Sequence, residues 1–329
     1  YLELHRGTLT THGLVKKQNR KLENKLKAVE FLWSCTNLKN YPSSELDASW
    51  KKLLINQFHD IIPGSSINLV YKTTHKEYNE IHKTCDDLID KAESKLFQKH
   101  SSSFVLSNAL SYHYQDVIEI PKEYSGHNIL KDDGEIVDTQ NINGKVYCKV
   151  CLPPLSFTTF SKGEKLKRST NNVNGYILEN KLIKYTFSND GTLTSALDKE
   201  TNNILLDGPG NVLSLYEDRP LNWDAWDIDF YYKESLLETA KAVKIKKVIS
   251  GPVLSLLEFH YTIGNSIVKQ IITLGNQSKR LDFDTYVEWK EKHKMLRVHF
   301  PTNIRSEQAS FDIQYGYVKR NTHKNTSWD

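Results

Sequence analysis

The stretch Asn56-Gln57-Phe58-His59-Asp60-Ile61-Ile62-Pro63-Gly64-Ser65-Ser66 sets a histidine beside an aspartate at the end of an apolar helical pattern. Pro63-Gly64 predicts the end of that helix, because proline lacks an amide hydrogen and glycine tolerates left-handed backbone. His59 is a candidate metal ligand and Asp60 a candidate substrate contact or supporting group. A histidine near a helix end is more often a structural hydrogen-bonder. One histidine cannot hold a metal, so further ligands must come from elsewhere.

Helical periodicity extends on both sides of this stretch, and residues 1–100 predict a three-helix bundle. The first helix follows Gly13. The second is opened by Pro42-Ser43-Ser44, with Ser44 and Asp47 at capping-box spacing, and Ser65 or Ser66 is expected to cap the third. The predicted core positions are Leu22, Leu26, Val29, Trp33, Leu46, Trp50, Leu53, Leu54, Phe58, Val70, Tyr78, Ile81, Leu88, Ala92 and Leu96.

From about residue 101 the pattern alternates as in strands, so we expect a small β domain over 101–170 and a large, truncated β-sandwich (super-sandwich) over 171–329. Residues 161–175 are polar and predict a linker or long loop. Asn189-Asp190-Gly191 and Gly264-Asn265 predict hairpin turns. The expected fold class is an α+β multidomain protein, a three-helix bundle followed by antiparallel β-sandwich domains. The predicted strands are 104–106, 116–120, 145–150, 182–187, 193–197, 243–249, 253–263, 266–274 and 281–289.

The bulk properties narrow the classes of partner. A hydrophobic content of 38% suits a globular protein, and the net charge of +4 is spread along the chain, so we expect no nucleic-acid partner. No apolar run approaches the roughly 18 residues of a membrane span, so we expect no membrane partner either. Four cysteines favour a reducing compartment and a cytoplasmic location. The chain starts without methionine and stops without a tail, so we expect it to be part of a longer polypeptide.

Two further stretches are candidate sugar-binding segments. His5 lies in a polar, glycine-centred segment, Leu4 to Thr11, which otherwise is a capping loop. Trp223 and Trp226 alternate with carboxylates in the segment 223–232; aromatic rings stack on sugars and carboxylates accept from hydroxyls. The simpler alternative is an aromatic-rich loop that fills an interface between layers, and from the pattern alone we prefer it.

Other familiar motifs are excluded. Cys148-x-x-Cys151 lies in a predicted strand, where positions three apart point to opposite faces, and no second pair follows, so neither zinc nor redox chemistry is expected there. The segment 223–232 contains carboxylates, but it lacks the glycine and the terminal glutamate of an EF-hand calcium loop. The sequence contains no phosphate-binding glycine-rich loop, no GxSxG and no HExxH.

Several motifs occur together in the order typical of one family. The chain resembles the middle region of glycoside hydrolase family 38 α-mannosidases, with the bacterial and cytosolic branch nearest. Leu9 stands where the family has an aromatic residue, which places the sugar subsite in question. The motifs that carry the resemblance are Leu4-His5-Arg6-Gly7-Thr8, Lys16 to Arg20, residues 56–66, Val70-Tyr71, Asp190-Gly191, Leu197-Asp198-Lys199, Trp223 to Asp227, Gln314-Tyr315-Gly316 and Arg320 to Asp329.

The resemblance implies a zinc-dependent retaining α-mannosidase that removes terminal α-D-mannose from mannosides and oligosaccharides. In such enzymes a catalytic barrel precedes the helices and supplies the nucleophile, the acid and three zinc ligands, a His and two Asp. His59 matches the fourth ligand, and Asp60 matches a residue that hydrogen-bonds the bound mannose. His5 is a looser match, to residues near the sugar. No catalytic residue is assigned here, and the chain alone is expected to be inactive.

Several alternatives are compatible with the sequence. The chain is also compatible with a non-catalytic carbohydrate-binding or structural module that would use Trp223 and Trp226. A different retaining glycosidase is a weaker option, because the stretch 56–66 is specific to the α-mannosidases in this form. Members of this branch are often oligomers, which allows a homo-oligomer here. The linkage preference and the natural substrate do not follow from the sequence.

Overall fold

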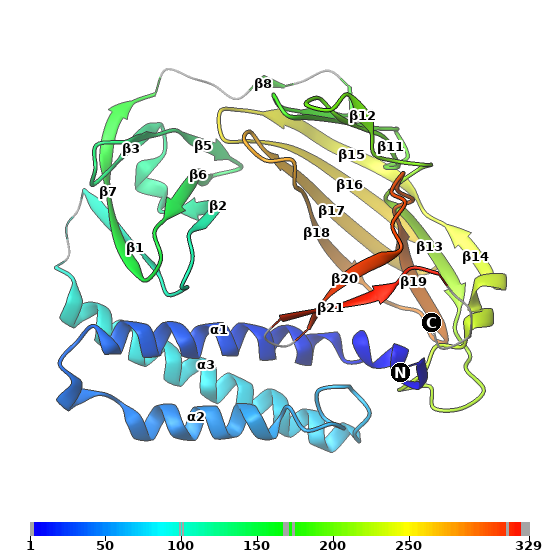
Figure 1. The fold of residues 1–329 in the computed structure, drawn as a ribbon, viewed down its shortest axis with the longest axis horizontal. Helices are drawn as coiled ribbons and strands as arrows, with labels where there is room; N and C mark the ends of the chain where they lie inside the picture. The colour runs from blue at the N-terminus through cyan, green and yellow to red at the C-terminus, as the bar shows by residue number, and fades with distance from the viewer. Residues whose placement is uncertain are drawn as a thin grey trace.

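The computed structural model describes residues 3–98, 100, 102–166, 171–172, 175–313 and 316–323. Its three long helices form a layer along one side, over which the β-sheets arch (Figure 1). The fold class is therefore confirmed as α+β with antiparallel sheets. The expected domain limits near residues 100 and 170 stay a proposal. No helix in these ranges is long and apolar enough to cross a membrane.

The helical layer comprises everything from η1 to α3, and its core follows the predicted stripes. Leu22, Leu26 and Leu53 have no exposed surface, since the 3.6-residue period brings them to one side of each helix. Leu54 and Phe58 are each 56% exposed, so their assignment to the core is wrong. The elements are η1 (Glu3–Leu9), α1 (Gly13–Ser34), η2 (Leu38–Asn40), α2 (Ser43–Ile55) and α3 (Asn68–Leu96).

The predicted helix boundaries need three corrections. Helix α2 ends at Ile55, eight residues before Pro63, so the stretch 56–66 is a series of turns and not the end of a helix. Ser44 lies inside α2, whose N-cap is Pro42 and has no side-chain cap bond. The N-cap of α3 is Ile67, so neither Ser65 nor Ser66 caps that helix. Both serines bond to Asp60 instead.

The small β unit, β1 to β7, consists of two antiparallel sheets with strand orders β1-β7-β3-β4 and β2-β6-β5. Strand β7 covers residues 161–165, so the loop predicted for them is wrong; residues 167–170 and 173–174 of that loop lie outside the described residues. Cys148 is buried and Cys151 exposed, which confirms their opposite faces. The strands are β1 (Ser103–Asn108), β2 (Tyr114–Ile120), β3 (His127–Lys131), β4 (Ile136–Val137), β5 (Thr139–Ile142), β6 (Lys145–Leu152) and β7 (Ser156–Lys165), with η3 (Lys122–Tyr124).

The large β unit, β8 to β21, is built on a sheet of order β18-β17-β16-β15-β8, whose inner face packs on neighbouring sheets around Phe259 and Tyr261. Gly191 and Gly264 have positive φ, as their hairpin turns require. The strands are β8 (Asn171–Asn172), β9 (Ile177–Glu179), β10 (Ile183–Phe187), β11 (Leu193–Asp198), β12 (Asn203–Ile204), β13 (Val212–Glu217), β14 (Leu236–Thr239), β15 (Lys241–Ser250), β16 (Leu254–Ile263), β17 (Ser266–Gly275), β18 (Leu281–Glu288), β19 (Lys294–His299), β20 (Gln308–Ile313) and β21 (Gly316–Asn321), with η4 (Phe230–Glu234).

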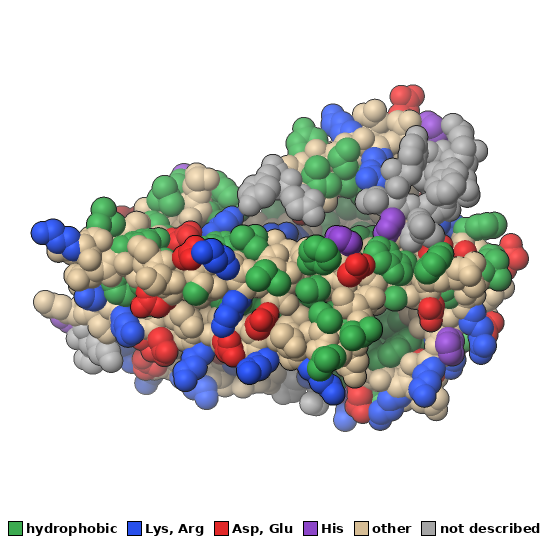
Figure 2. All heavy atoms as spheres, turned by 90° about the horizontal axis from the view of Figure 1, so that it is seen from below, with side chains coloured by type: hydrophobic (Ala, Val, Ile, Leu, Met, Phe, Trp, Pro, Cys, Tyr) green, Lys and Arg blue, Asp and Glu red, His purple; other side chains and the backbone are tan. Residues whose placement is uncertain are grey.

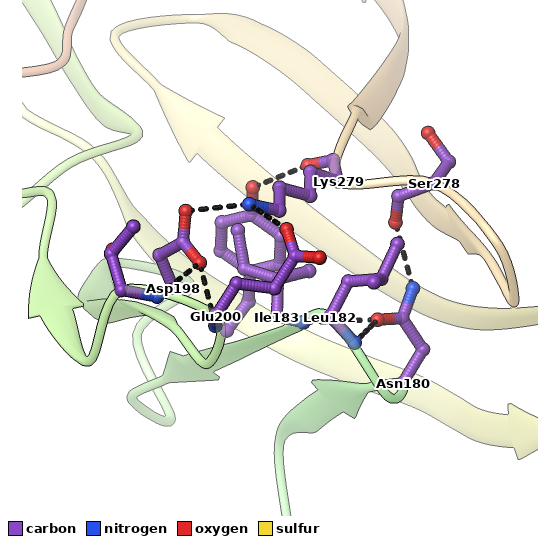
Figure 3. Close-up of polar contacts among 9 residues, drawn as sticks. Asn180, Leu182, Ile183, Asp198, Glu200, Ser278 and Lys279 are labelled. Atoms are coloured by element: carbon purple, nitrogen blue, oxygen red, sulfur yellow. Dashed lines mark hydrogen bonds and ion pairs between the residues drawn. The ribbon is translucent and has the colours of Figure 1, made fainter.

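A polar network joins two sheets of the large β unit (Figure 3). Lys279, in the turn between β17 and β18, lies 2.7 Å from Asp198 and 2.6 Å from Glu200. Asn180 donates to the carbonyls of Gly275 and Ser278 from the other side. The ammonium group of Lys279 lowers the pKa of Asp198 below its usual value, so the contact favours the charged carboxylate.

The small and large β units meet through Gln140. Its amide donates to the carbonyl of Leu254 at 2.9 Å and accepts from the backbone amides of Val253 and Leu254. Arg280 also reaches across and donates to both carboxylate oxygens of Asp116. These buried and bidentate contacts fix how the two units lie against each other.

Candidate functional site

His59 and Asp60 lie on the turns that follow α2. His59 Nε2 is 3.3 Å from Asp60 Oδ2, and the His59 side chain is 73% exposed. The ring of Phe58 packs beside the imidazole at a centroid distance of 4.2 Å. An imidazole nitrogen and a carboxylate are therefore presented together on the surface, where a second molecule or another part of the polypeptide can reach both.

Hydrogen bonds fix the backbone of this loop, while the His59 ring stays exposed to solvent. Ser65 Oγ donates to the Asp60 carboxylate at 3.1 Å, and Ser66 Oγ donates to the Asp60 carbonyl at 2.7 Å. The hydroxyl of Tyr71, on α3, donates to the same carbonyl and accepts from the Ser66 amide. These neighbours thus set the orientation of Asp60. A side chain that binds a ligand in one geometry needs such support.

Two predicted segments that are far apart in the sequence lie side by side. The Gly7 amide donates to the carbonyl of Trp226 at 2.9 Å, and the rings of His5 and Trp226 meet edge to face at 5.1 Å. Nδ1 of His5 is buried and has no hydrogen-bond partner among the residues that the structure describes. The structure therefore pairs His5 with Trp226, an association that the sequence pattern did not predict.

Trp223 behaves differently from Trp226. It is 64% exposed and has a φ of +62°, at the start of a turn whose next amides, of Trp226 and Asp227, donate to its carbonyl. Trp226 is half-buried. The segment 223–232 thus fills part of an interface, as the simpler alternative held, and also leaves one indole free to stack on a ligand.

Exposed apolar side chains flank the His59 loop in the sequence. Ile55 is 64%, Ile67 69% and Leu69 67% exposed, beside the half-exposed Phe58. Figure 2 shows hydrophobic side chains among histidines and acidic residues on this helical side of the molecule. A group of large apolar side chains around a polar centre is typical of a surface that packs against another protein part.

The loop fits one corner of a metal site. Histidine nitrogen is a preferred Zn²⁺ ligand, and the exposed imidazole of His59 is accessible for it. Within the described ranges, no three His, Cys, Asp or Glu side chains come together as a metal-binding group. The donors of this loop are thus sufficient for one ligand position of a metal site.

The sequence pattern missed a cleft between the two β units. It has a volume of about 990 Å³, and none of the predicted site residues lines it. Tyr147 of β6 and Asp284 of β18 belong to its walls, and burial raises the pKa of Tyr147, with Asp284 among the charges that add to the effect. Its walls come together only in the folded chain, so no local motif signals the cleft.

Two parts of the chain match known family models. Residues 3–96 match the alpha mannosidase middle domain, and residues 178–329 match the glycosyl hydrolases family 38 C-terminal domain. The chain is 32% identical to alpha-mannosidase G of Dictyostelium discoideum and 32% identical to alpha-mannosidase 2C1 of Homo sapiens. Both alignments cover 100% of this chain but 35% and 32% of the relatives, so the chain spans about a third of their length.

Solved structures agree on the fold. An alpha-mannosidase from Enterococcus faecalis V583 superimposes with a TM-score of 0.74 at 18% identity, over 98% of this chain and 46% of that one. A second Enterococcus faecalis protein, described as a member of glycosyl hydrolase family 38, gives a TM-score of 0.71 over 96% of this chain and 48% of its own. With matches in both its helical and its sheet-forming parts, the chain belongs to glycosyl hydrolase family 38.

Proposed function

We propose that this chain is part of a zinc-dependent retaining α-mannosidase that hydrolyses terminal α-D-mannose from mannosides and oligosaccharides. The observation that carries the proposal is the His59 and Asp60 pair, exposed on a loop whose backbone is fixed and whose rim is apolar. Family membership and the names of the relatives, alpha-mannosidases, give the reaction class.

The residues of this chain take two roles in the proposal. His59 supplies one metal ligand, and Asp60 accepts hydrogen bonds from sugar hydroxyls. Bound zinc would supply Lewis-acid binding and orientation of those hydroxyls. The nucleophile, the general acid and three further ligands belong to a catalytic barrel outside this chain. The apolar rim around Phe58 is the surface on which we place that barrel.

Substitution of His59 in the full-length protein tests the assignment. His59→Ala should lower both bound zinc and hydrolysis of an aryl α-mannoside by more than about 100-fold, because removal of a ligand is more severe than the 10–100-fold loss on changing a supporting residue. His113→Ala, at an exposed position of the small β unit, is the control. Stoichiometric zinc in His59→Ala would refute the role. The isolated chain 1–329 should cleave no aryl α-mannoside.

A second candidate function is a carbohydrate-binding module without chemistry of its own. The exposed Trp223 and the cleft beside Tyr147 favour it, since exposed aromatic rings near carboxylates suit sugars. Calorimetry of the isolated chain with α-mannobiose separates the two functions. Binding that is abolished by Trp223→Ala or Tyr147→Ala but unaffected by His59→Ala would support the module and not the enzyme.

A cytoplasmic location and a homo-oligomeric state complete the proposal. Cys35, Cys85, Cys148 and Cys151 are all free, and two of them are exposed, which is typical of a reducing compartment. Fractionation of the source cells and light scattering of the full-length protein test these two points. Recovery in a secreted fraction would contradict the location, and a monomeric mass would contradict the oligomer.

A further inference from the structure

Lys16 connects the His59 loop to the N-terminal segment. Its Nζ lies 2.5 Å from the carbonyl of Thr11, 2.7 Å from that of Ile62 and 3.1 Å from that of Pro63. An ammonium group has three protons, and these three carbonyls take all of them. Partial burial lowers the pKa of Lys16. A lysine on an amphipathic helix usually extends into solvent, so this convergence marks an unusual position.

Thr11 continues the connection on the other side. Its hydroxyl lies 2.7 Å from the carbonyl of Gly7 and 3.2 Å from that of Ala225, one residue before Trp226. Gly64 packs directly against it: a Cβ at position 64 would lie 2.6 Å from Thr11 Cγ2 and 2.8 Å from the Thr11 carbonyl oxygen. Any side chain at 64 would therefore push the two segments apart.

These contacts form one unbroken path between the candidate loops. It runs from Pro63 through Lys16 and Thr11 to Ala225, and so joins the loop that carries His59 to the turn that carries Trp226. The path consists of polar contacts at a half-buried place. Removing the Lys16 ammonium takes a donor away from the carbonyls of Thr11, Ile62 and Pro63. The path is separate from His59 and Asp60, because the Lys16 ammonium donates to these three carbonyls.

We propose that Lys16 is a positioning residue, which with Thr11 holds the His59 loop in register with the Trp226 turn. The inference rests on the proposed function, because it assigns Lys16 to the same metal and sugar site. Lys16 touches neither the metal nor the sugar. It acts through the backbone of residues 61–63, whose position decides where His59 and Asp60 point.

The chemistry of lysine explains the choice of residue. Three carbonyls converge on one point, which a compact ammonium satisfies, whereas the planar fork of arginine spreads its donors over several ångströms. Methionine keeps the length of the stem but supplies no donor. Lys16→Met should thus release the loop, and Lys16→Arg should keep part of the contact.

The test uses the full-length protein with three variants: Lys16→Met, Lys16→Arg and, as control, Lys17→Met at the exposed neighbouring position. We expect Lys16→Met to weaken zinc binding and lower kcat/KM by about 10–100-fold, the usual effect of changing a residue that orients a ligand. Excess zinc should recover part of the activity, Lys16→Arg should be intermediate, and Lys17→Met should match the wild type.

Hydrogen exchange gives a readout that needs no activity. The amides of Ile61, Ile62 and Gly64, and those of Trp226 and Asp227, should exchange faster in Lys16→Met, with α3 unchanged. A double-mutant cycle with Thr11→Val should be non-additive, because both residues belong to one path.

Two results would overturn the role of Lys16. One is a Lys16→Met enzyme with wild-type zinc affinity and unchanged exchange at 61–64. The other is an activity loss in Lys16→Met and Lys16→Arg that merely follows a fall in Tm, with exchange raised evenly along α1 to α3. A wild-type protein that binds no zinc and cleaves no mannoside would defeat the proposed function instead, and in that case the exchange data would still decide whether the path exists.

Discussion

The helical layer and the large β unit are stabilised in different ways. Leu22, Leu26 and Leu53 of the helices are fully buried in a continuous apolar core. The large β unit also has such a core, but its turns are joined by charged and amide groups such as Lys279 with Asp198. The stability of an apolar core falls mainly when side-chain volume is lost. The contribution of ion pairs at turns depends on pH and on backbone geometry. The two regions should therefore fail under different changes.

The largest effect is expected in the helical core. Leu53→Ala should lower the free energy of unfolding by about 2–5 kcal/mol, because it leaves a cavity in a fully buried site. Leu54→Ala, one residue along the same helix, should change it by less than about 0.5 kcal/mol, because Leu54 is exposed. Urea unfolding followed by circular dichroism measures both. Equal losses would mean that Leu54 is covered in solution.

The next effect tests turn geometry in the sheets. Gly191 and Gly134 have φ values of +85° and +86°, so alanine is strained at either position by about 1–2 kcal/mol. At Gly191 the new Cβ would also lie 2.7 Å from Cε1 of the buried Tyr261, whereas nothing lies within 4 Å of Gly134. Gly191→Ala should thus cost about 2–4 kcal/mol in total, the excess coming from overpacking. Similar unfolding midpoints for the two variants would contradict the contact.

A smaller effect is expected where the two β units meet. Gln140→Ala removes three contacts to Val253 and Leu254 and should cost about 1–3 kcal/mol through unsatisfied backbone groups. Amides 253 and 254 should then exchange faster. Gln115→Ala, at an exposed position, is the matched control and should leave their exchange unchanged. Unaltered protection in Gln140→Ala would show that the junction is held by other contacts.

The smallest effect is expected when the pH is lowered, which should reduce the stability of the helical layer before that of the large β unit. Burial lowers the pKa of His82, and nearby Lys25 adds to it while Asp86 opposes it. The unfolded chain therefore binds more protons below about pH 6.5, and helical stability falls as pH drops through the window under that value. Asp198 has a lowered pKa, so its contribution is present above about pH 3.8 and is lost only below it.

The free energy of unfolding of the helical layer, measured in urea through the circular dichroism signal at 222 nm, should accordingly fall between pH 7 and 5. The stability of the sheets should fall only at lower pH. The size of this loss is reduced by solvent, because His82 is partly exposed. His82→Gln should reduce the pH dependence to the part that His12 contributes, since burial lowers the pKa of His12 as well, and His113→Gln should leave it in place. A flat profile in the wild type would contradict the prediction.

Local periodicity was sufficient to predict the central positions of the helical core, but not the edge of that core or the ends of the helices. The stripes through Leu22 and Leu26 were correct, because the period of a helix decides which side chains share a face. Leu54 was misplaced because one step from Leu53 turns a side chain by 100° toward solvent, and only the neighbouring helices define which face is covered. Ser65 and Ser66 resemble helix caps, yet their hydroxyls bond back to Asp60, a local competition that a motif does not reveal.

The candidate site also has one part that the sequence predicted and another that it did not. His59 and Asp60 are adjacent in sequence, so their pairing was visible from the start. The meeting of His5 with Trp226 and the three carbonyls around Lys16 depend on chain segments that only tertiary folding brings together. No pattern of charge or polarity on the first helix distinguishes Lys16 from the exposed Lys17 beside it.

The contact between Thr11 and Ala225 has a consequence for the order of folding. It joins residues 214 positions apart, so the entropy of closing that loop must be offset before the contact contributes any stability. The backbone hydrogen bonds of the helices are local, so we expect the helices to form early and this junction to be completed only after the helical layer and the large β unit exist. Recovery of helical signal during refolding is therefore a poor measure of whether the proposed site has assembled.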